Sequence, residues 1–384
     1  MAKSIACDAQ RVGVDVGRGG LGAKTFETEK ECDRAVLVGV NCSCDGLDEL
    51  ASLCDTCGIM TVGRVTQNIK DIDVTYYIGR GKVDEVRACV TENGATCVVF
   101  DVELSGSKVR NLEDAIGVAV LDRSKIILDI FAGRAQTAEG KLQVELAQLK
   151  YNLPRLIGAG GLMSKMKSSV GMRGPGEKKL ETDKRRVHDE INFLEKRLTE
   201  LKKTRGVAST QAKKSGKARV CLVGYTNSGK STLFNTLTKA GVLAEDKLFA
   251  TLDPKTANVY IKGTDDAGVG IQILLTDTVG FIDRLPHEFI RAFESTLSSV
   301  TDADLLLHIV DVSNQNFEKQ IEVVNGVLKN IGAGGIPTII VYNKIDKAGG
   351  GVVGDVVAIS AKNNTNIELL KQKIVAILDK GESK

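Results

Sequence analysis

Four short segments in the second half of the chain combine glycine, hydroxyl and charged residues at spacings that suit a phosphorylated ligand. In chain order they are Gly224–Ser231 (GYTNSGKS), Asp277–Gly280 (DTVG), Asn343–Asp346 (NKID) and Ser360–Lys362 (SAK). The first fits the phosphate-binding loop pattern G-x-x-x-x-G-K-[ST], and each segment lies at the end of a predicted strand. One such motif could arise by chance, but four in this order predict a single site for a guanine nucleotide.

The first segment has the chemistry of a phosphate cradle. Glycine at positions 224 and 229 allows the backbone N–H groups to face one concavity, where the N-terminus of the following helix adds positive potential. Lys230 supplies a charge for the β- and γ-phosphates, and the Ser231 hydroxyl is a ligand for Mg²⁺. The alternative to a phosphate-binding loop is an ordinary glycine-rich turn, which the presence of the other three segments disfavours.

The second segment predicts a sensor for the γ-phosphate. The Asp277 carboxylate can hold Mg²⁺ through water, and the Gly280 N–H can meet the γ-phosphate. Thr251, in the loop between the first two segments, is the predicted second metal ligand, with Thr256 in reserve. We therefore predict Lys230 and Gly280 as catalytic residues, and Ser231 and Thr251 as ligands of Mg²⁺.

The third segment selects the base. The Asp346 carboxylate can accept hydrogen bonds from both N1–H and the N2 amino group of guanine, a donor pair that adenine lacks. Ser360-Ala-Lys362 adds a backbone donor for O6. The complete set of predicted GTP contacts is Gly224, Tyr225, Thr226, Asn227, Ser228, Gly229, Lys230, Ser231, Phe249, Ala250, Thr251, Leu252, Asp253, Asp277, Thr278, Val279, Gly280, Asn343, Lys344, Ile345, Asp346, Ser360, Ala361 and Lys362.

Two positions modify this prediction. Phe281 stands where small Ras-type GTPases carry a glutamine that orients water, so we expect slow intrinsic hydrolysis and a partner that completes the site. Asn227 occupies the position at which several GTPases hold K⁺ beside the phosphates, so K⁺ is a second possible cofactor. A side chain that only stabilises the loop explains Asn227 equally well.

The elements that must position these residues follow from apolar patterning. Buried strands are predicted at 219–223, 271–275 and 337–342, and a helix at 232–240. Upstream, strands at 35–40 and 96–100, a possible strand at 126–131, and helices at 47–57, 81–92 and 106–117 predict an N-terminal α/β domain. Its turn at 79–82 (GRGK) could meet a phosphate, but a plain strand-to-helix connection is favoured.

Two heptad-like series lie between these domains. The first is Leu142, Leu146, Leu149 and Leu153, and the second is Leu180, Val187, Ile191, Leu194, Leu198 and Leu201. They predict an antiparallel helical hairpin. A glycine-rich loop containing 158–161 (GAGG), Arg173 and 174–176 (GPG) is expected to join the helices. The whole fold is then α/β: an N-terminal α/β domain, this hairpin, and a P-loop GTPase domain with a mostly parallel sheet.

Charge is concentrated in the hairpin region. Residues 155–217 hold 17 Lys plus Arg and 7 Asp plus Glu, a net of +10, whereas the whole chain is +3 and the remainder therefore about −7. A basic arm on an acidic body favours a phosphate-rich partner, most plausibly RNA. A solvated helical face is the alternative. Few aromatic residues are interleaved, so contact with the RNA backbone is expected rather than stacking on bases.

Composition limits the remaining options. The chain has 384 residues, 42% of them hydrophobic and 26% charged, which is ordinary for a soluble globular protein. No stretch has the length of a membrane span and the start lacks a signal-peptide core, so we expect a cytoplasmic protein. Nine cysteines is an odd count, so a complete disulfide framework is not implied. Cys42, Cys44, Cys54 and Cys57 could hold zinc, but an amphipathic helix over 47–57 explains this spacing better.

At this point the chain resembles the HflX group of ribosome-associated GTPases, from about residue 33 to the end. The segments that carry the resemblance are 77–82 (YIGRGK), 121–125 (LDRSK), 133–140 (GRAQTAEG), 171–177 (GMRGPGE), 180–183 (LETD) and 249–254 (FATLDP). The resemblance implies a GTPase that acts on the large ribosomal subunit, with the N-terminal region toward the peptidyl-transferase centre. It also implies that stalled or idle ribosomes are separated into subunits.

The resemblance also gives expectations for particular residues. Arg173, Lys178 and Lys179 are expected to contact rRNA, although the two lysines stand where the family commonly has a threonine and another polar residue. Many relatives carry a further domain after the last helix, and no role of such a domain is carried over. We expect a poorly defined segment at 1–32, the α/β domain at 33–132, the hairpin at 133–203, a linker at 204–217 and the GTPase domain at 218–384.

Two other functions stay open on sequence grounds. One is a GTP-gated RNA-binding factor in ribosome assembly, for which hydrolysis would be incidental. The other, use of an adenine nucleotide by the N-terminal domain, has no clear motif. The protein is expected to be a monomer, with GTP or GDP and the rRNA of the large subunit as its partners.

Overall fold

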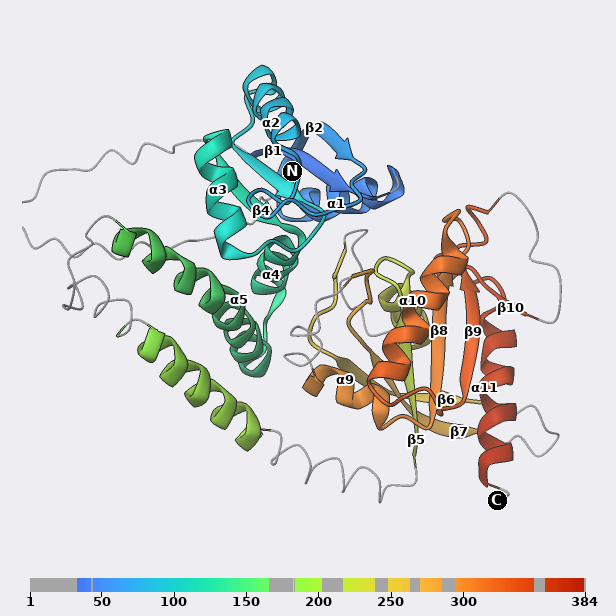
Figure 1. Cartoon of the computed structure of the whole chain (residues 1–384). Coiled ribbons are helices and arrows are strands. Elements are labelled where there is room, and N and C mark those ends of the chain that lie inside the picture. The colour runs from blue at the N-terminus through green and yellow to red at the C-terminus, as the bar shows by residue number, and fades with distance from the viewer. Residues whose placement is uncertain are drawn as a thin grey trace, which may run out of the picture.

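A computed structural model of the chain describes residues 33–42, 44–165, 182, 184–201, 217–238, 248–262, 270–284, 294–348 and 356–382. Within these residues the chain forms two sheets joined by a helical region (Figure 1). The smaller sheet has four parallel strands and the larger has six strands. The predicted α/β fold class and its three-part order are confirmed.

The N-terminal domain is a parallel sheet covered on both faces by helices. Its strand order is β2-β1-β3-β4, with β1 (Arg34–Val40) in the middle beside β2 (Met60–Gln67) and β3 (Cys97–Phe100), and β4 (Ala119–Asp122) at the edge. Alternate residues of β1 face opposite sides. Ala35 and Leu37 pack in the same core as helix α1 (Cys44–Thr56), and Val36 and Val38 pack with α2 (Arg80–Asn93) and α3 (Gly106–Ile116). The three predicted helices of this domain are confirmed.

One predicted strand is wrong. Residues 126–131 lie inside helix α4 (Arg123–Arg134), whose first turn is capped by the Asp122 carboxylate accepting from the Lys125 N–H at 2.9 Å. Helix α4 packs against α1 and against α5 (Ala138–Lys165), and five of its apolar side chains are buried: Ile126, Ile127, Leu128, Ile130 and Phe131. A helix buried around most of its circumference has no polar face, so its continuous apolar run resembles that of a buried strand.

The helical hairpin is confirmed, with a correction to where its first helix ends. Leu146 of α5 packs with Ile191, Leu194 and Leu198 of the helix over 184–201, and Leu142, Leu149, Leu153 and Val187 border this core. Helix α5 continues through the glycines at 158–161 to Lys165, where a loop was predicted. Glycine disfavours a helix by only about 1 kcal/mol per residue, which neighbouring turns can offset. Leu180 lies outside the described residues, and Leu201 is partly exposed.

The C-terminal domain is built on the six-stranded sheet β10-β9-β8-β5-β7-β6. All neighbouring strands are parallel except β6 (Lys255–Ile261), which runs antiparallel to β7 (Ile271–Asp277). The other strands are β5 (Ala218–Gly224), β8 (Leu305–Asp311), β9 (Thr338–Asn343) and β10 (Val357–Ala358), and the helices are α7 (Lys230–Thr238), α9 (Glu294–Thr301), α10 (Phe317–Asn330) and α11 (Ile367–Glu382). The strands predicted at 219–223, 271–275 and 337–342 and the helix after the first motif are confirmed, the last within 230–238.

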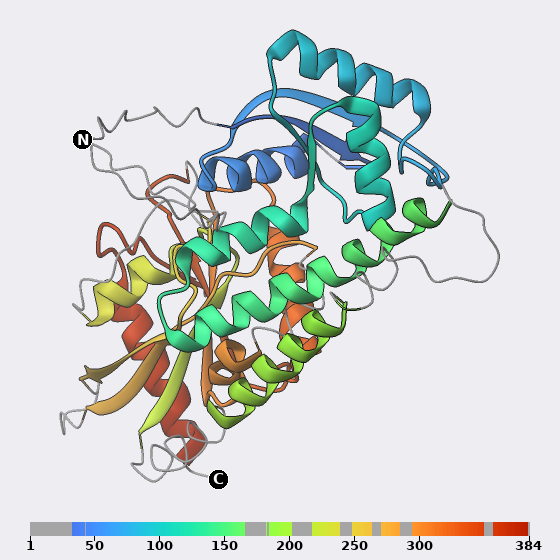
Figure 2. The same ribbon diagram turned by 90° about the vertical axis from the view of Figure 1, so that its left-hand side faces the viewer.

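The N-terminal domain and the C-terminal domain share one continuous apolar core. It joins residues of α1 and α4, such as Leu50 and Phe131, to Phe249 and Phe281 of the C-terminal domain. The rings of Phe131 and Phe249 meet edge to face with centroids 4.7 Å apart. The two views of the ribbon show α4 below the N-terminal sheet and the start of α5 beside the C-terminal domain (Figures 1 and 2).

A polar cluster completes this contact, and we call it the junction network: Glu49, Asp101, Arg123, Tyr225, Asp283 and Arg284. The guanidinium of Arg123 bonds Glu49 at 2.6 Å, Asp101 at 2.9 Å and the Asp283 carbonyl at 3.1 Å. Burial opposes the charge of Arg123, but the two carboxylates outweigh burial and raise its pKa. Arg284 also reaches Asp101, at 3.2 Å. The network therefore fixes the domains by directional bonds as well as by packing.

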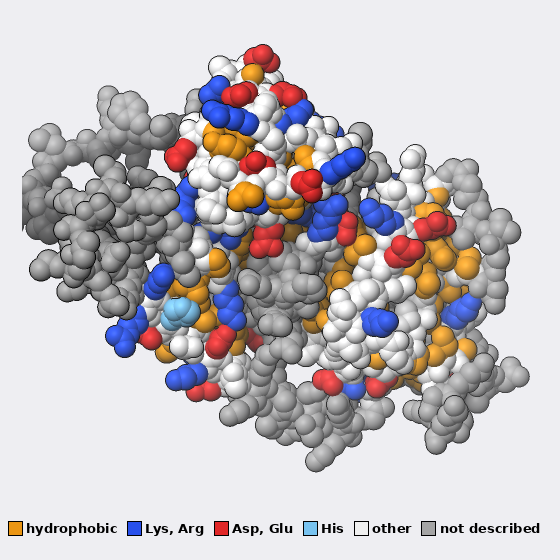
Figure 3. Space-filling model, viewed as in Figure 1, with side chains coloured by type: hydrophobic (Ala, Val, Ile, Leu, Met, Phe, Trp, Pro, Cys, Tyr) orange, Lys and Arg blue, Asp and Glu red, His pale blue; other side chains and the backbone are white. Residues whose placement is uncertain are grey.

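On this side of the molecule, both the N-terminal domain and the helices at the lower left carry Lys and Arg side chains interspersed with Asp and Glu (Figure 3). None of the described helices combines the length and the apolarity needed to cross a bilayer.

The cysteine cluster does not assemble as a metal site among the described residues. Cys54 is buried with Leu50 and Leu53 in the core under α1, as the amphipathic-helix interpretation predicted. Burial raises the pKa of the Cys54 thiol to about 12, which opposes the thiolate that zinc requires. No group of three or more metal-ligating side chains occurs in the described part of the chain, and the Cys44 side chain lies outside it.

Candidate nucleotide site

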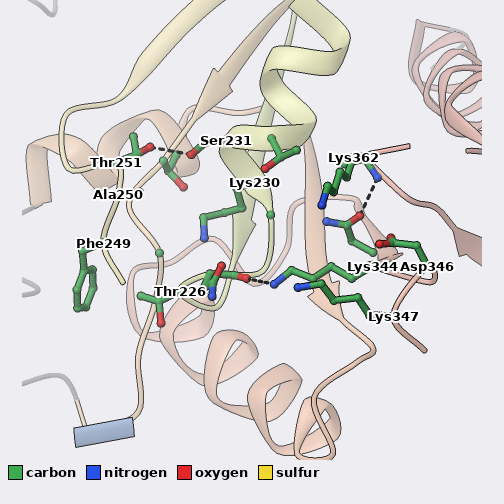
Figure 4. Close-up of a pocket in the computed structure, with 17 residues that line it drawn as sticks. Thr226, Lys230, Ser231, Phe249, Ala250, Thr251, Lys344, Asp346, Lys347 and Lys362 are labelled. Atoms are coloured by element: carbon green, nitrogen blue, oxygen red, sulfur yellow. Dashed lines mark hydrogen bonds between the residues drawn. The ribbon is translucent and has the colours of Figure 1, made fainter. Parts of the chain in front are cut away.

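A cavity of about 350 Å³ opens in the C-terminal domain where the four sequence motifs meet (Figure 4). The carboxyl ends of β5, β7 and β9 deliver the first three motifs to this edge of the sheet. Ligands of open α/β sheets bind at this edge, because the loops that leave the strands form a crevice there. The residues that line the cavity are Thr226, Asn227, Gly229, Lys230, Ser231, Thr232, Phe249, Ala250, Thr251, Thr278, Gly280, Asn343, Lys344, Asp346, Lys347, Ala361 and Lys362.

The phosphate loop depends on the second glycine of its motif. Gly229 has φ +93°, and a Cβ there would lie 2.2 Å from the Asn343 side-chain nitrogen. Lys230 is buried below the loop, where its Nζ donates to the carbonyl oxygens of Tyr225 at 2.7 Å and Gly224 at 3.2 Å. Burial lowers the pKa of Lys230 to about 8, against the raising effect of Asp277. A bound phosphate would place a negative charge beside this ammonium group and favour its protonated form.

Three oxygen-bearing side chains converge beside the loop. Ser231 Oγ lies 2.7 Å from Thr251 Oγ1 and 2.7 Å from Asp277 Oδ2, and Thr251 donates to the same carboxylate oxygen at 3.1 Å. Burial raises the pKa of Asp277, opposed by the Ser231 hydrogen bond and by the charge of Lys230. Asp277 Oδ1 is buried and has no hydrogen-bond partner among the described residues.

This donor set fits Mg²⁺. The ion prefers hard oxygen ligands and keeps several waters, so two hydroxyls with a carboxylate behind them suit it. The reserve ligand Thr256 lies instead on β6, where its hydroxyl bonds Thr276 at 3.1 Å. Of the two threonines considered, Thr251 is therefore the one positioned to act with Ser231.

Asn343 ties three motifs together. Its amide nitrogen donates to the Ser228 carbonyl at 2.9 Å, and its amide oxygen accepts from the Ala361 N–H at 3.0 Å. Lys344 follows in a left-handed conformation, φ +63°, and its Nζ reaches the Asn227 carbonyl at 2.7 Å. Asn343, the last residue of β9, thus has a structural role: it links the phosphate loop to the Ser360–Lys362 segment.

The Asp346 carboxylate, which is expected to bind the base, is held by a hydrogen bond from Ser360. Ser360 Oγ donates to Asp346 Oδ1 at 2.6 Å, and this hydrogen bond lowers the pKa of Asp346. The carboxylate therefore stays ionised and acceptor-only, which is the state that can receive the two donors of guanine. Lys347 and Lys362 flank it in the cavity wall.

Most of the predicted contacts line the cavity. Those that do not line it are Gly224, Tyr225, Ser228, Leu252, Asp253, Asp277, Val279, Ile345 and Ser360. Among them, Ser360 and Asp277 hold lining residues by hydrogen bonds, whereas Tyr225 and Asp253 face the N-terminal half of the chain. Sequence reasoning missed Thr232 and Lys347, which adjoin motif residues and were detectable only by extending each motif by one position.

Phe281 is buried, with 1% of its surface exposed, and its ring belongs to the core between the domains. Its backbone pairs with the phosphate loop, since Phe281 N–H donates to the Gly224 carbonyl at 3.0 Å and its carbonyl accepts from Thr226 at 2.7 Å. The side chain therefore points away from the cavity, as expected for a residue that orients no water. The expected RNA contacts Arg173, Lys178 and Lys179 lie outside the described residues.

The sheet, the phosphate loop, the paired hydroxyls and the Asn-Lys-x-Asp loop define this protein as a P-loop GTPase. Three family models match successive parts of the chain: the GTP-binding GTPase N-terminal family over residues 45–132, the GTP-binding GTPase middle region over 134–212, and the 50S ribosome-binding GTPase family over 219–344. The chain belongs to the HflX family of GTPases, enzymes that hydrolyse GTP.

Individual relatives support this assignment over most of the chain. GTPase HflX of Caldanaerobacter subterraneus subsp. tengcongensis is 46% identical, with 91% of this chain and 81% of the relative covered. GTPase HflX of Escherichia coli is 43% identical, with 84% and 75% covered. A solved structure, the crystal structure of an SsGBP and GDP complex, is similar at 26% identity and a TM-score of 0.50, covering 90% of this chain and 98% of that one.

Proposed function

We propose that this GTPase binds the large ribosomal subunit and couples GTP binding and hydrolysis to the separation of stalled or idle ribosomes. One observation carries the proposal: a guanine-type pocket, with Asp346 oriented by Ser360, lies in a chain whose G domain matches the 50S ribosome-binding GTPase family. The net charge of +10 on residues 155–217 adds a surface that suits rRNA.

Each lining group has a role in this proposal. The backbone N–H groups of the phosphate loop and the Lys230 ammonium bind the phosphates, and the Gly280 N–H senses the γ-phosphate. Ser231 and Thr251 would hold Mg²⁺, and the Asp277 carboxylate would orient these two hydroxyl groups. When bound, the metal neutralises charge on the β- and γ-phosphate oxygens. Asp346 receives N1–H and the N2 amino group of guanine.

Hydrolysis then requires a water in line with the γ-phosphate. Phe281 is held in the interdomain core and cannot orient that water. Some other element must do so, and the bound ribosomal subunit is the source we propose. GTP turnover should accordingly be slow in the isolated protein and rise on addition of large subunits.

Asn227 is the residue we propose for K⁺ stimulation. Its backbone is left-handed, with φ +57°, and its carbonyl already accepts from Lys344. Equal turnover in K⁺ and Na⁺ buffers would contradict this role and leave Asn227 as a loop-stabilising residue.

The remaining assignments extend this proposal along the chain. Residues 33–132 act as the N-terminal domain, 133–203 as the hairpin, 204–217 as a linker and 218–384 as the G domain, after a segment at 1–32. Arg173, Lys178 and Lys179 are the proposed rRNA contacts. The protein would work in the cytoplasm as a monomer.

The second candidate is a GTP-gated factor for assembly of the large subunit, favoured by the same basic arm. Sedimentation of intact ribosomes with the protein and GTP, GDP or a non-hydrolysable GTP analogue separates the two. A splitting factor shifts intact ribosomes to free subunits with GTP, and the Lys230→Ala variant does not. Binding only to immature large particles, with intact ribosomes unchanged, would favour assembly instead.

A further inference from the structure

The loop that carries Thr251 is fastened to a different domain by its acidic residue. Asp253 Oδ2 accepts from the backbone N–H groups of Gln136 at 3.0 Å and Thr137 at 2.9 Å, and Asp253 Oδ1 accepts from the Thr137 hydroxyl at 2.6 Å. These donors precede the first turn of α5 and lie 117 and 116 residues from Asp253 in sequence. A carboxylate at this end of a helix also gains from the helix dipole.

Thr137 is itself the cap of α5. Its hydroxyl accepts from the Gly140 N–H at 2.9 Å, while its carbonyl accepts from the Lys141 N–H at 3.0 Å. The hydroxyl therefore links Asp253 directly to the first turn of the helix. Any change in the position of α5 must either move Asp253 or break this chain of bonds.

The opposite end of the same loop is held by packing. Phe249 is buried and its ring meets Phe131 of α4 edge to face. Thr251 lies between these two attachments, with its hydroxyl against Ser231 and Asp277. Thr251 therefore lies between two residues, Phe249 and Asp253, that both contact the N-terminal half of the chain.

Gly140 lies so close to Asp253 that a larger residue at position 140 would clash with the Asp253 carboxylate. A Cβ at Gly140 would lie 2.5 Å from Asp253 Oδ1 and 3.0 Å from Thr137 Oγ1. Alanine is otherwise better than glycine inside a helix. Gly140→Ala is therefore a steric probe of the contact between Asp253 and Thr137.

We propose that Asp253 is a positioning residue for GTP hydrolysis, which clamps the Thr251 loop to the start of α5 so that the magnesium site closes only when the helical region is docked. The inference rests on the proposed role of Thr251 at the metal. Because GDP lacks the γ-phosphate that a closed loop encloses, the clamp should affect triphosphate binding more than diphosphate binding.

The test compares Asp253→Ala and Gly140→Ala with wild type and with Gly326→Ala. Gly326 lies in α10, where an added Cβ would meet nothing within 4 Å, so it is a matched helical glycine control. Binding of fluorescent GDP and of a fluorescent non-hydrolysable GTP analogue is titrated at several Mg²⁺ concentrations. In both clamp variants the analogue should bind about tenfold more weakly, the cost of losing charge-assisted hydrogen bonds, whereas GDP affinity should stay within about twofold.

Hydrogen exchange supplies a readout that does not depend on turnover. In wild type, the Gln136 and Thr137 amides should be better protected with the analogue than with GDP, because coupling between two sites is reciprocal. Asp253→Ala should remove this difference. Unchanged GDP affinity shows that each variant is folded.

Two results overturn the inference, and they are distinguishable. If Thr251→Ala weakens analogue binding but Asp253→Ala and Gly140→Ala match wild type, the clamp has no positioning role and the proposed site stands. If Thr251→Ala itself matches wild type at every Mg²⁺ concentration, the proposed metal role fails and the clamp fails with it.

Discussion

The Tyr225 hydroxyl, inside the phosphate-binding loop, hydrogen-bonds the Glu49 carboxylate of α1 in the N-terminal domain. The same hydroxyl accepts from the Asp283 N–H at 2.8 Å, just after the γ-phosphate segment. One side chain therefore joins the phosphate loop, the segment that follows the Asp277–Gly280 motif and the neighbouring domain. The junction network continues from Glu49 through Arg123 to Asp101.

Tyr225→Phe tests this connection with little change in packing. The variant keeps the buried ring but leaves Glu49 and the Asp283 amide short of one bond each, so the free energy of unfolding should fall by about 1–3 kcal/mol. Denaturant titration measures the change. Tyr260→Phe, at a 57% exposed position on β6, is the matched control and should lie within about 0.5 kcal/mol of wild type.

Arg123→Met tests the centre of the junction network. Removing this buried guanidinium takes the Arg123 partner from both Glu49 and Asp101, and breaking a buried pair costs about 3–5 kcal/mol. The control is Arg87→Met, which breaks an exposed pair with Asp84 and should cost less than about 1 kcal/mol. Equal destabilisation of the two variants in urea would contradict a buried network.

Asp346→Asn should change which base is bound. Asparagine presents an amide donor to the N1–H and N2 amino donors of guanine, so GTP affinity should fall about 100-fold or more. Xanthine carries a carbonyl oxygen where guanine has the amino group, so XTP should compete better than GTP in the variant. Competition against fluorescent GDP gives both values. Retention of GTP preference would remove Asp346 from the base site.

Gly280→Ala should impair the γ-phosphate sensor. A Cβ there would lie 2.8 Å from the Thr226 Cα and 3.0 Å from Lys230 Nζ, so the phosphate loop or Gly280 must shift. We expect at least about a tenfold fall in turnover, with GDP binding nearly unchanged. Gly335→Ala, where the added Cβ meets nothing within 4 Å, is the control for single-turnover assays.

Thiol labelling tests the buried cysteines. At pH 8 the Cys54 thiol, with a pKa near 12, is almost entirely protonated, and its labelling by iodoacetamide should be slow. None of the Cys54 surface is exposed, so the reagent can reach the thiol only when the core opens, and labelling should become fast once urea unfolds the protein. Peptide mass spectrometry resolves the site. Rapid labelling at pH 8 would place Cys54 outside the core.

The nucleotide pocket was predictable because its chemistry is local in sequence. Gly229, Lys230 and Ser231 are adjacent, and Asp346 follows a strand whose apolar run is easily recognised. The strand predicted at 126–131 failed for the opposite reason. Periodicity cannot separate a strand from a helix when burial removes the polar face, and only packing against α1 and α5 decides between them.

The contacts between domains were not predictable. Asp253 meets Thr137 and Tyr225 meets Glu49 across more than 100 residues, and nothing in either short motif specifies the partner. Asp253 and Tyr225 were predicted as nucleotide contacts because they lie inside nucleotide motifs. Their side chains instead face the N-terminal domain and the start of α5.

Helix α5 is attached at two separate points along its length. Near its middle, Tyr151 and Arg155 both bond the buried Asp122 carboxylate at 2.7 Å, while its start is attached to Asp253. About 16 residues, or roughly 24 Å of helix, separate these points. A tilt of about 5° around the Asp122 pivot would therefore displace the Thr137 end by roughly 2 Å, more than a hydrogen bond tolerates. Movement of the far end of α5 would therefore be transmitted through Asp253 to the loop that carries Thr251.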